Sequence, residues 1–248
     1  MGRLESARDR LAIALDVPAL ADAEALIEAL AGVPGWLKVG GELFTAAGPP
    51  ALAAAGRRAK VFLDTKLHDI PNTVARSVAA ATRHGVSMLT LHAGGGSAML
   101  RAAREAAEDA AAACGGSRPA LIAVTVLTSF SPADLEEVGI AGAEVEDQVA
   151  RLVDLAVAAG LDGVVASPWE AASVRGRAGE ALRIVTPGIR PRDWPADDQA
   201  RAASAAEAIA AGSDVLVVGR PVLRAPDPAA AARKLIGEIE QARGAQEA

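Results

Sequence analysis

The sequence predicts one (β/α)8 barrel, the TIM-barrel class of α/β fold, as a single domain over residues 1–248. Eight short apolar runs recur along the chain, and the segments between them are alanine-rich with a 3.6-residue apolar period. Near-continuous apolar strands that alternate with helices are typical of a parallel sheet covered by helices. Eight such units in about 250 residues favour a closed barrel over an open doubly wound sheet, which remains the alternative.

The eight apolar runs mark the expected strands in chain order. They span residues 10–17, 36–40, 60–67, 87–94, 121–128, 163–168, 183–189 and 214–221. In the third run, Phe62, Asp64 and Lys66 alternate with Val61 and Leu63, so the two sets fall on opposite faces of a strand. We expect the branched aliphatic face to meet the outer helices and the face with the charged residues to line the barrel interior.

The amino-acid composition argues against two classes of binding partner, nucleic acids and membranes. The chain has a net charge of −6 and only three Phe, three Trp and no Tyr, so it lacks the basic stripe and the stacking surfaces of a nucleic-acid-binding protein. No apolar run reaches the roughly 18 residues that span a bilayer, and the polar N-terminus does not resemble a secretory signal. A lone cysteine, Cys114, is typical of a reducing compartment. We therefore expect a cytoplasmic protein that binds neither nucleic acid nor membranes.

Polar side chains gather at the carboxyl ends of the expected strands. In chain order they are Asp16, Lys38, Asp64, Lys66, His92, Thr128, Ser129, Ser167, Arg190 and Arg220. In a barrel these ends meet at one mouth, where the active sites of this fold are built. Burying Asp64 and Lys66 on one strand is costly unless the charges are paired or used, and the alternative to a site is a purely structural network of ion pairs.

The balance of cations points to proton transfer. The chain has 21 Arg and only four Lys, yet the cations expected inside the mouth are Lys38 and Lys66. Arginine does not release its proton in a protein, whereas lysine does, so this choice favours a reaction that delivers a proton. Arg190 and Arg220 closely follow glycines after the seventh and eighth strands, where barrels commonly bind phosphate. Surface solvation is the alternative role for both arginines.

Two further patterns are less specific. Asp69 precedes Pro71 at an expected helix start, where capping the helix is the ordinary role of an acidic residue. His68, His92 and Asp64 do not have the spacing of a metal-binding motif, so we expect no metal. Hydrogen bonding in the wall of the site is the expected role of His92.

The run FLDTKLHDIPNTV, residues 62–74, resembles the D-x-K-x-x-D-I-P-N-T signature of the orotidine 5′-phosphate decarboxylase family. The resemblance extends over essentially the whole chain through ALDV, LKVG, TLHAGGG, VTVLTS, VASPWEA, TPGIRP and VVGRPV. Related sugar-phosphate barrels share D-x-K-x-x-D, but its combination with TPGIRP and GRP is specific to this family in its shorter bacterial form. The resemblance implies a carboxy-lyase of pyrimidine biosynthesis that converts orotidine 5′-monophosphate (OMP) to uridine 5′-monophosphate (UMP) and CO2 without a cofactor.

The resemblance also implies a role for each matching residue. The implied catalytic residues are Lys66, as proton donor, with Asp64, Asp69 and Lys38. The implied substrate contacts are Asp16 and Lys38 for the ribose, Asp64 for the carboxylate, Thr128 for the pyrimidine or the loop over it, and Arg190, Gln199, Gly219 and Arg220 for the phosphate. In the implied homodimer, Asp69, Ile70 and Thr73 of each subunit would reach the partner's site.

Two alternative functions stay open at this point. One is a related metal-dependent barrel that decarboxylates or cleaves a sugar phosphate, against which Lys38 and TPGIRP count. The other is a barrel that binds a nucleotide without turning it over, against which the complete set of charged residues counts. Loss of activity with EDTA would favour the first alternative, and tight UMP binding without turnover of OMP would identify the second.

Overall fold

The computed structural model describes residues 4, 6–142, 144–191 and 202–247. Eight parallel strands form a closed barrel in which each strand pairs with the next and β8 pairs with β1. The strands are β1 (Leu11–Ala14), β2 (Trp36–Gly40), β3 (Lys60–Leu67), β4 (Met88–His92), β5 (Ala120–Val124), β6 (Gly163–Val165), β7 (Arg183–Thr186) and β8 (Val215–Val218). The predicted closed barrel is therefore confirmed, and the alternative of an open sheet is wrong.

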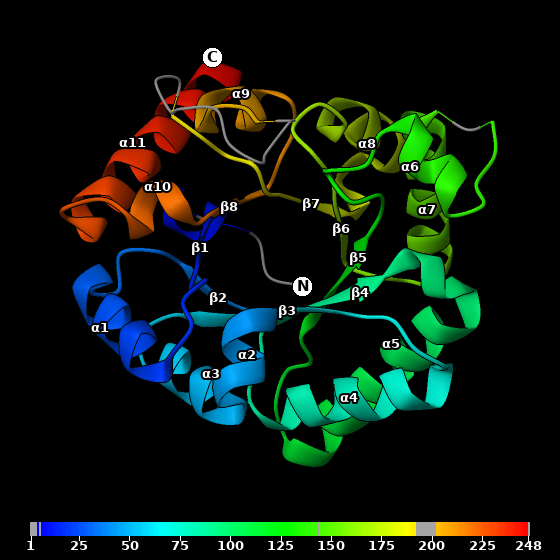
Figure 1. Ribbon diagram of the computed structural model, residues 1–248, viewed down its shortest axis with the longest axis horizontal. Helices are drawn as coiled ribbons and strands as arrows, with labels where there is room; N and C mark the ends of the chain where they lie inside the picture. Colours follow the sequence, from blue (N-terminus) through cyan, green and yellow to red (C-terminus); the bar gives the residue numbers. More distant parts are fainter. Residues whose placement is uncertain (1–3, 5, 143, 192–201, 248) are drawn as a thin grey trace.

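Helices surround the barrel as a ring in Figure 1. They are α1 (Leu20–Leu30), α2 (Gly41–Ala47), α3 (Pro49–Gly56), α4 (Pro71–Arg83), α5 (Gly96–Cys114), α6 (Pro132–Glu137), α7 (Val145–Ala158), α8 (Ala171–Ala178), α9 (Ala205–Ala210), α10 (Arg220–Leu223) and α11 (Pro228–Glu247), with short 3-10 turns η1 (Arg8–Arg10), η2 (Ala93–Gly95) and η3 (Gly179–Ala181). Among the described residues, no helix combines the length and the apolar character needed to cross a membrane.

Local sequence determines where several helices begin and end. Pro71 occupies the first turn of α4, where its missing N–H has no intrahelical role. At the start of α6, the Ser131 hydroxyl accepts from the Asp134 N–H while the Asp134 carboxylate accepts from the Ser131 N–H, which is a capping box. Helix α5 ends at Gly115 with φ of 65°, a conformation that glycine adopts without strain.

The barrel wall separates two apolar clusters. The interior cluster consists of Ala12, Ala14, Trp36, Phe62, Met88, Ala120, Ile122, Val185, Val215 and Val217. Strand residues of the opposite parity, including Val61 and Leu63, pack in the larger cluster between the strands and the helices. The predicted direction of the third strand is therefore confirmed for Phe62, Val61 and Leu63.

Several strands end earlier than the apolar runs predict. β2 and β3 have the predicted bounds, whereas β1 ends at Ala14, β5 at Val124 and β6 at Val165. Asp16 and Thr128, predicted as strand ends, thus lie on the loops that follow β1 and β5. Hydropathy does not separate the last residue of a strand from a partly buried loop, because both contribute apolar side chains to the same core.

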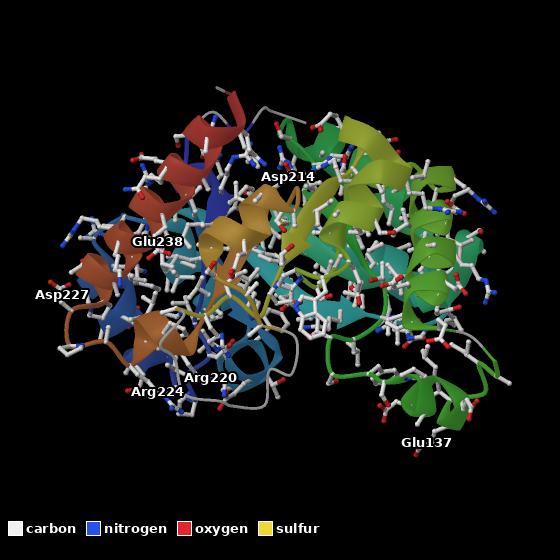
Figure 2. The ribbon with its side chains drawn as sticks, turned by 90° about the horizontal axis from the view of Figure 1, so that it is seen from above. Glu137, Asp214, Arg220, Arg224, Asp227 and Glu238 are labelled. Carbon is white, nitrogen blue, oxygen red and sulfur yellow. The ribbon has the colours of Figure 1, made fainter. Side chains whose placement is uncertain are left out.

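The two ends of the barrel differ in the residues they carry. Figure 2 places Asp214, which precedes β8, and Arg220, which follows β8, at opposite ends of the molecule. The end that carries Arg220 is the mouth, where the carboxyl ends of the parallel strands meet. Helix α6, labelled at Glu137, lies at this same end.

Candidate active site

A cavity of about 290 Å³ opens at the mouth of the barrel. Its apolar lining consists of Ala14, Phe62, Val165, Val185, Pro187 and Val217, and its remaining lining of Asp16, Lys38, Asp64, Lys66, Thr128, Gly188, Arg190, Gly219 and Arg220. The structure therefore brings together seven polar side chains that the sequence placed at the mouth. His92, Ser129 and Ser167 were expected there as well, but they do not line the cavity.

Four of the polar residues form a chain of alternating charge. The Nζ of Lys38 lies 3.2 Å from Oδ1 of Asp16 and 3.3 Å from Oδ2 of Asp64. The other carboxylate oxygen of Asp64 lies 3.0 Å from Nζ of Lys66. The inner side chains, Lys38 and Asp64, are only 9% and 13% exposed, whereas the outer ones, Asp16 and Lys66, are 53% and 42% exposed. The outer carboxylate and the outer ammonium are therefore open to a substrate.

The two inner groups hold each other in their charged forms. Burial alone would lower the pKa of Lys38, but the charges and hydrogen bonds of Asp64 and Asp16 raise it above the ordinary lysine value. Burial likewise opposes ionisation of Asp64, but the Lys38 and Lys66 ammonium groups, with hydrogen bonds from Lys66 and Thr90, hold its pKa below the ordinary value. At neutral pH Lys38 and Asp64 are therefore a fixed pair of charges in the lining of the cavity.

An irregular segment of β3 carries Asp64 and Lys66. Leu63 pairs with Leu89 and Leu67 with Leu91, so three residues of β3 oppose the single residue Thr90 of β4. Within this bulge Lys66 has φ of 47°, a left-handed conformation that is uncommon for a residue with a side chain. The predicted common face of Phe62, Asp64 and Lys66 is confirmed, because all three line the cavity, but a bulge rather than a regular strand period places the ammonium of Lys66 beside Asp64.

Two residues that support this chain of charges were missed from the sequence. Thr90 is fully buried and contacts both Lys66 and Asp64 through its hydroxyl. At Gly40, a Cβ atom would lie 3.0 Å from Oδ1 of Asp16 and 3.1 Å from Nζ of Lys38, closer than nearly all side chains tolerate. The sequence features that could have indicated these two residues are the hydroxyl of Thr90 within the otherwise apolar run MLTL and the glycine at the end of β2.

Arginines and glycines line the side of the cavity next to β7 and β8. Arg190 is 9% exposed, its N–H bonds the carbonyl of Ala203 at 2.9 Å, and its guanidinium bonds the carbonyl of Ile189 at 3.0 Å. Arg220 begins α10, directly after Gly219. This wall therefore combines two arginines with two glycines, Gly188 and Gly219. Gln199, expected to act with them, lies outside the described residues.

Asp69, Ile70 and Thr73 lie at the start of α4, and none of them lines the cavity of its own chain. All three are exposed, and Ile70 is among the most exposed large apolar residues described, at 66%. Asp69 accepts the N–H of Ile70 at 2.6 Å. The expectation that Asp69 caps the helix is therefore wrong, because Ile70 is the N-cap residue and no side chain caps α4.

His92 departs from its expected role. Its Nδ1 is buried without a hydrogen-bond partner, and its ring stacks on His68 with the centroids 5.1 Å apart. Burial first, and then the neighbouring charges of His68 and Lys66, lower its pKa below the ordinary value. Within the described part of the chain, no group of three or more His, Cys, Asp or Glu side chains is arranged to hold a metal ion.

Known proteins resemble this chain over nearly its whole length. Residues 9–235 match the model of the orotidine 5′-phosphate decarboxylase / HUMPS family. Orotidine 5′-phosphate decarboxylase of Moorella thermoacetica is 52% identical over 94% of this chain and 93% of its own length. The enzyme of the same name from Halorhodospira halophila is 53% identical over 94% and 97%.

Solved structures agree with this sequence similarity. The crystal structure of orotidine 5′-phosphate decarboxylase from Lactobacillus acidophilus superposes with a TM-score of 0.82 at 35% identity, over 92% of this chain and 98% of that one. The same closed barrel is thus accompanied by sequence similarity well beyond the level that indicates fold alone. A family model that covers most of the barrel and relatives at about 50% identity together establish that this chain belongs to the orotidine 5′-phosphate decarboxylase / HUMPS family.

Proposed function

We propose that this protein decarboxylates orotidine 5′-monophosphate to uridine 5′-monophosphate and CO2 without a cofactor. The observation that carries the proposal is the alternating chain Asp16–Lys38–Asp64–Lys66 at the mouth of the barrel. Relatives of 52% and 53% identity that are named for this decarboxylase support it. A purely structural network of ion pairs would not require its terminal ammonium, that of Lys66, to lie at an open cavity.

Lys66 is the proposed proton donor. Loss of CO2 from C6 of the pyrimidine leaves a carbanion in an orbital that the ring does not delocalise, so the protein has to stabilise that charge directly. An ammonium group fixed next to the carbon stabilises the developing charge and then transfers its proton. The contact with Asp64, 3.0 Å from Nζ, and the bulge of β3 fix the position of this ammonium.

Lys38 and Asp64 form the support for this step. Both residues are the buried inner members of the series Asp16–Lys38–Asp64–Lys66, and both stay ionised. Their charges are therefore already oriented before the substrate binds. A preorganised set of charges costs no reorganisation as the reaction proceeds, which is the main source of electrostatic catalysis.

The rest of the cavity supplies substrate binding. Asp16, half exposed beside Lys38, and Lys38 itself bind the ribose hydroxyl groups. Arg190, Gly219 and Arg220 bind the phosphate, with Gln199 as a further contact. Thr128 binds the pyrimidine. Binding energy from the phosphate, which does not react, holds the pyrimidine in register with Lys66.

A homodimer completes each site in this proposal. Asp69, Ile70 and Thr73 do not line the cavity of their own chain and are exposed on the loop and helix that follow Lys66. Burial of the Ile70 side chain, which is 66% exposed, against a second chain would remove its apolar surface from water. We place the reaction in the cytoplasm, in keeping with the free, exposed thiol of Cys114.

One assay tests the proposed reaction. Purified protein is mixed with OMP, and conversion to UMP is followed by ultraviolet absorbance in the presence and absence of EDTA. We expect turnover that EDTA does not change. Turnover lost with EDTA would identify a metal-dependent barrel, and tight UMP binding without turnover of OMP would identify a non-catalytic nucleotide-binding protein.

Subunit mixing tests the shared site. The variants Asp69→Ala and Lys66→Ala are each expected to be inactive, but their hybrid dimer contains one site with both residues intact. Mixing the two proteins should therefore restore activity to a fraction of the wild-type value. Absence of recovery, with subunit exchange confirmed by mass spectrometry, would contradict the role of Asp69 in the partner's site.

A further inference from the structure

Thr90 contacts the bulge of β3 at two points through a single hydroxyl. The backbone N–H of Lys66 lies 3.0 Å from Oγ1 of Thr90, and this oxygen lies 3.0 Å from Oδ1 of Asp64. An amide N–H only donates, and the ionised carboxylate only accepts. Thr90 therefore accepts from the main chain of Lys66 and donates to the side chain of Asp64, which accounts for its hydroxyl hydrogen.

These contacts close a ring around the catalytic lysine. The carboxylate oxygen that receives the Thr90 hydroxyl also lies 3.0 Å from Nζ of Lys66. Both ends of Lys66, its backbone amide and its ammonium, are thus tied to the same pair of groups. Thr90 itself is fully buried on the strand next to the bulge and does not line the cavity.

The position of Thr90 makes it the support of a strained backbone. Asp64, Thr65 and Lys66 oppose it alone, so the ladder between β3 and β4 lacks its regular partners at this level. The left-handed backbone of Lys66, at φ of 47°, costs energy that its surroundings must offset. A hydrogen bond from the Lys66 amide to a buried hydroxyl replaces the carbonyl that a regular ladder would provide.

We propose that Thr90 is a positioning residue for the decarboxylation: its hydroxyl holds the β3 bulge and the Asp64 carboxylate so that the Lys66 ammonium stands at the reacting carbon. This inference rests on the proposed function and adds to it a residue that does not touch substrate. Loss of the hydroxyl should lower kcat more than it changes KM, because the phosphate and ribose contacts lie on other strands and loops.

Two substitutions separate the hydroxyl from the packing of this side chain. Thr90→Val keeps the shape and removes the hydroxyl, whereas Thr90→Ser keeps the hydroxyl and removes a methyl group. We expect kcat for OMP to fall about 10- to 100-fold in Thr90→Val and to stay within about threefold of wild type in Thr90→Ser, with KM changed less than about threefold in both. The matched control is Thr82→Val, which removes a buried hydroxyl that bonds the carbonyl of Val78 in α4.

A readout that does not depend on turnover completes the test. Hydrogen exchange at the Lys66 amide should be at least about tenfold faster in Thr90→Val than in wild type or Thr90→Ser, because the amide loses its acceptor. Wild-type kcat in Thr90→Val, equal losses in Val and Ser, or unchanged exchange would each overturn the proposal. If wild-type protein does not convert OMP, the proposed function fails, whereas the exchange rates still decide whether Thr90 holds the bulge.

Discussion

Buried ion pairs occur both at the mouth of the barrel and at its opposite end, the floor, where the strands begin. The pairs at the two ends contain different cations. At the floor, Arg118 makes two contacts of 2.6 and 2.8 Å with Asp162, which precedes β6. The same carboxylate accepts the N–H of Leu121 in β5 at 2.9 Å. Asp214, before β8, likewise receives Arg175 and the N–H of Ile184 in β7. Asp162 and Asp214 thus each join an arginine to the start of a strand.

In the ion pairs of the mouth described here the cations are lysines, and these pairs join side chains rather than the starts of strands. Lys38 and Lys66 contact Asp16 and Asp64 through single nitrogen atoms at 3.0 to 3.3 Å. A guanidinium with two parallel hydrogen bonds fixes geometry and keeps its proton, whereas an ammonium is a compact charge that can transfer one. We therefore propose that the floor pairs serve the fold and the mouth pairs serve the chemistry.

Replacing a lysine of the mouth with arginine, the cation of the buried floor pairs, tests this distinction most directly. In Lys66→Arg we expect kcat for OMP to fall about 1000-fold or more, because a guanidinium keeps the positive charge but does not release a proton. Lys66→Ala should lose as much, with the fold retained by circular dichroism. The control is Lys60→Arg at the floor end of the same strand, where Lys60 pairs with Asp9 at 3.1 Å. Turnover of Lys66→Arg within tenfold of wild type would contradict proton donation by Lys66.

Arg220, like Arg190, is an arginine of the mouth, and its proposed role is to bind phosphate rather than to transfer a proton. Arg220→Ala should weaken UMP binding by about 3–4 kcal/mol, measured by calorimetry, because the phosphate loses a charged donor. Arg224→Ala is the matched control, since Arg224 ends the same short helix but does not line the cavity. An equal loss of affinity for uridine, which has no phosphate, would show that Arg220 does not bind that group.

A floor substitution should have the opposite profile. Asp162→Ala removes the acceptor of Arg118 and of the Leu121 amide, so we expect the free energy of unfolding to fall by about 2–3 kcal/mol in urea titrations. The kcat for OMP at 25 °C should stay within about twofold of wild type. Asp154→Ala, which breaks an exposed pair with Arg177, is the control and should change stability little. A large loss of kcat in folded Asp162→Ala would mean that the floor also shapes the chemistry.

Much of this architecture could be predicted because it depends on local patterns. The apolar runs predicted eight strands, and alternation within the third run placed Phe62 inside the barrel and Leu63 outside it. The polar ends of strands identified Lys38 and Asp64, since a charge at the end of a buried run needs a partner.

Other features depend on pairing between strands, which a single sequence does not contain. The bulge at Lys66 exists because β3 has three residues between Leu63 and Leu67, whereas β4 has only one residue between their partners. The role of Thr90 follows from that register, as its hydroxyl looks like an ordinary strand residue in the run MLTLH. The early end of β5 was missed for a similar reason, because LIAVTVLT is apolar apart from Thr125 and Thr128, whereas only residues up to Val124 pair with β6.

The ion pairs of the mouth should also make the free energy of unfolding depend on pH, in both the acidic and the alkaline range. Asp64 has a pKa below its ordinary value of 3.8, so its contribution to stability is fully present above that value and is lost as the pH falls through the folded pKa. Lys38 has a pKa above its ordinary value of 10.5, so its contribution is fully present below that value and is lost as the pH rises through the folded pKa.

Two substitutions at the mouth isolate these contributions. The difference in the free energy of unfolding between wild type and Asp64→Asn should be constant near neutral pH and should decline as the pH falls below about 4, because the wild-type protein then loses its favourable charge. The difference between wild type and Lys38→Met should instead decline above about pH 10.5. Urea titrations across both ranges measure the two differences. A difference for Asp64→Asn that stays level on acidification would mean that the ionised Asp64 gains no stability from Lys38 and Lys66.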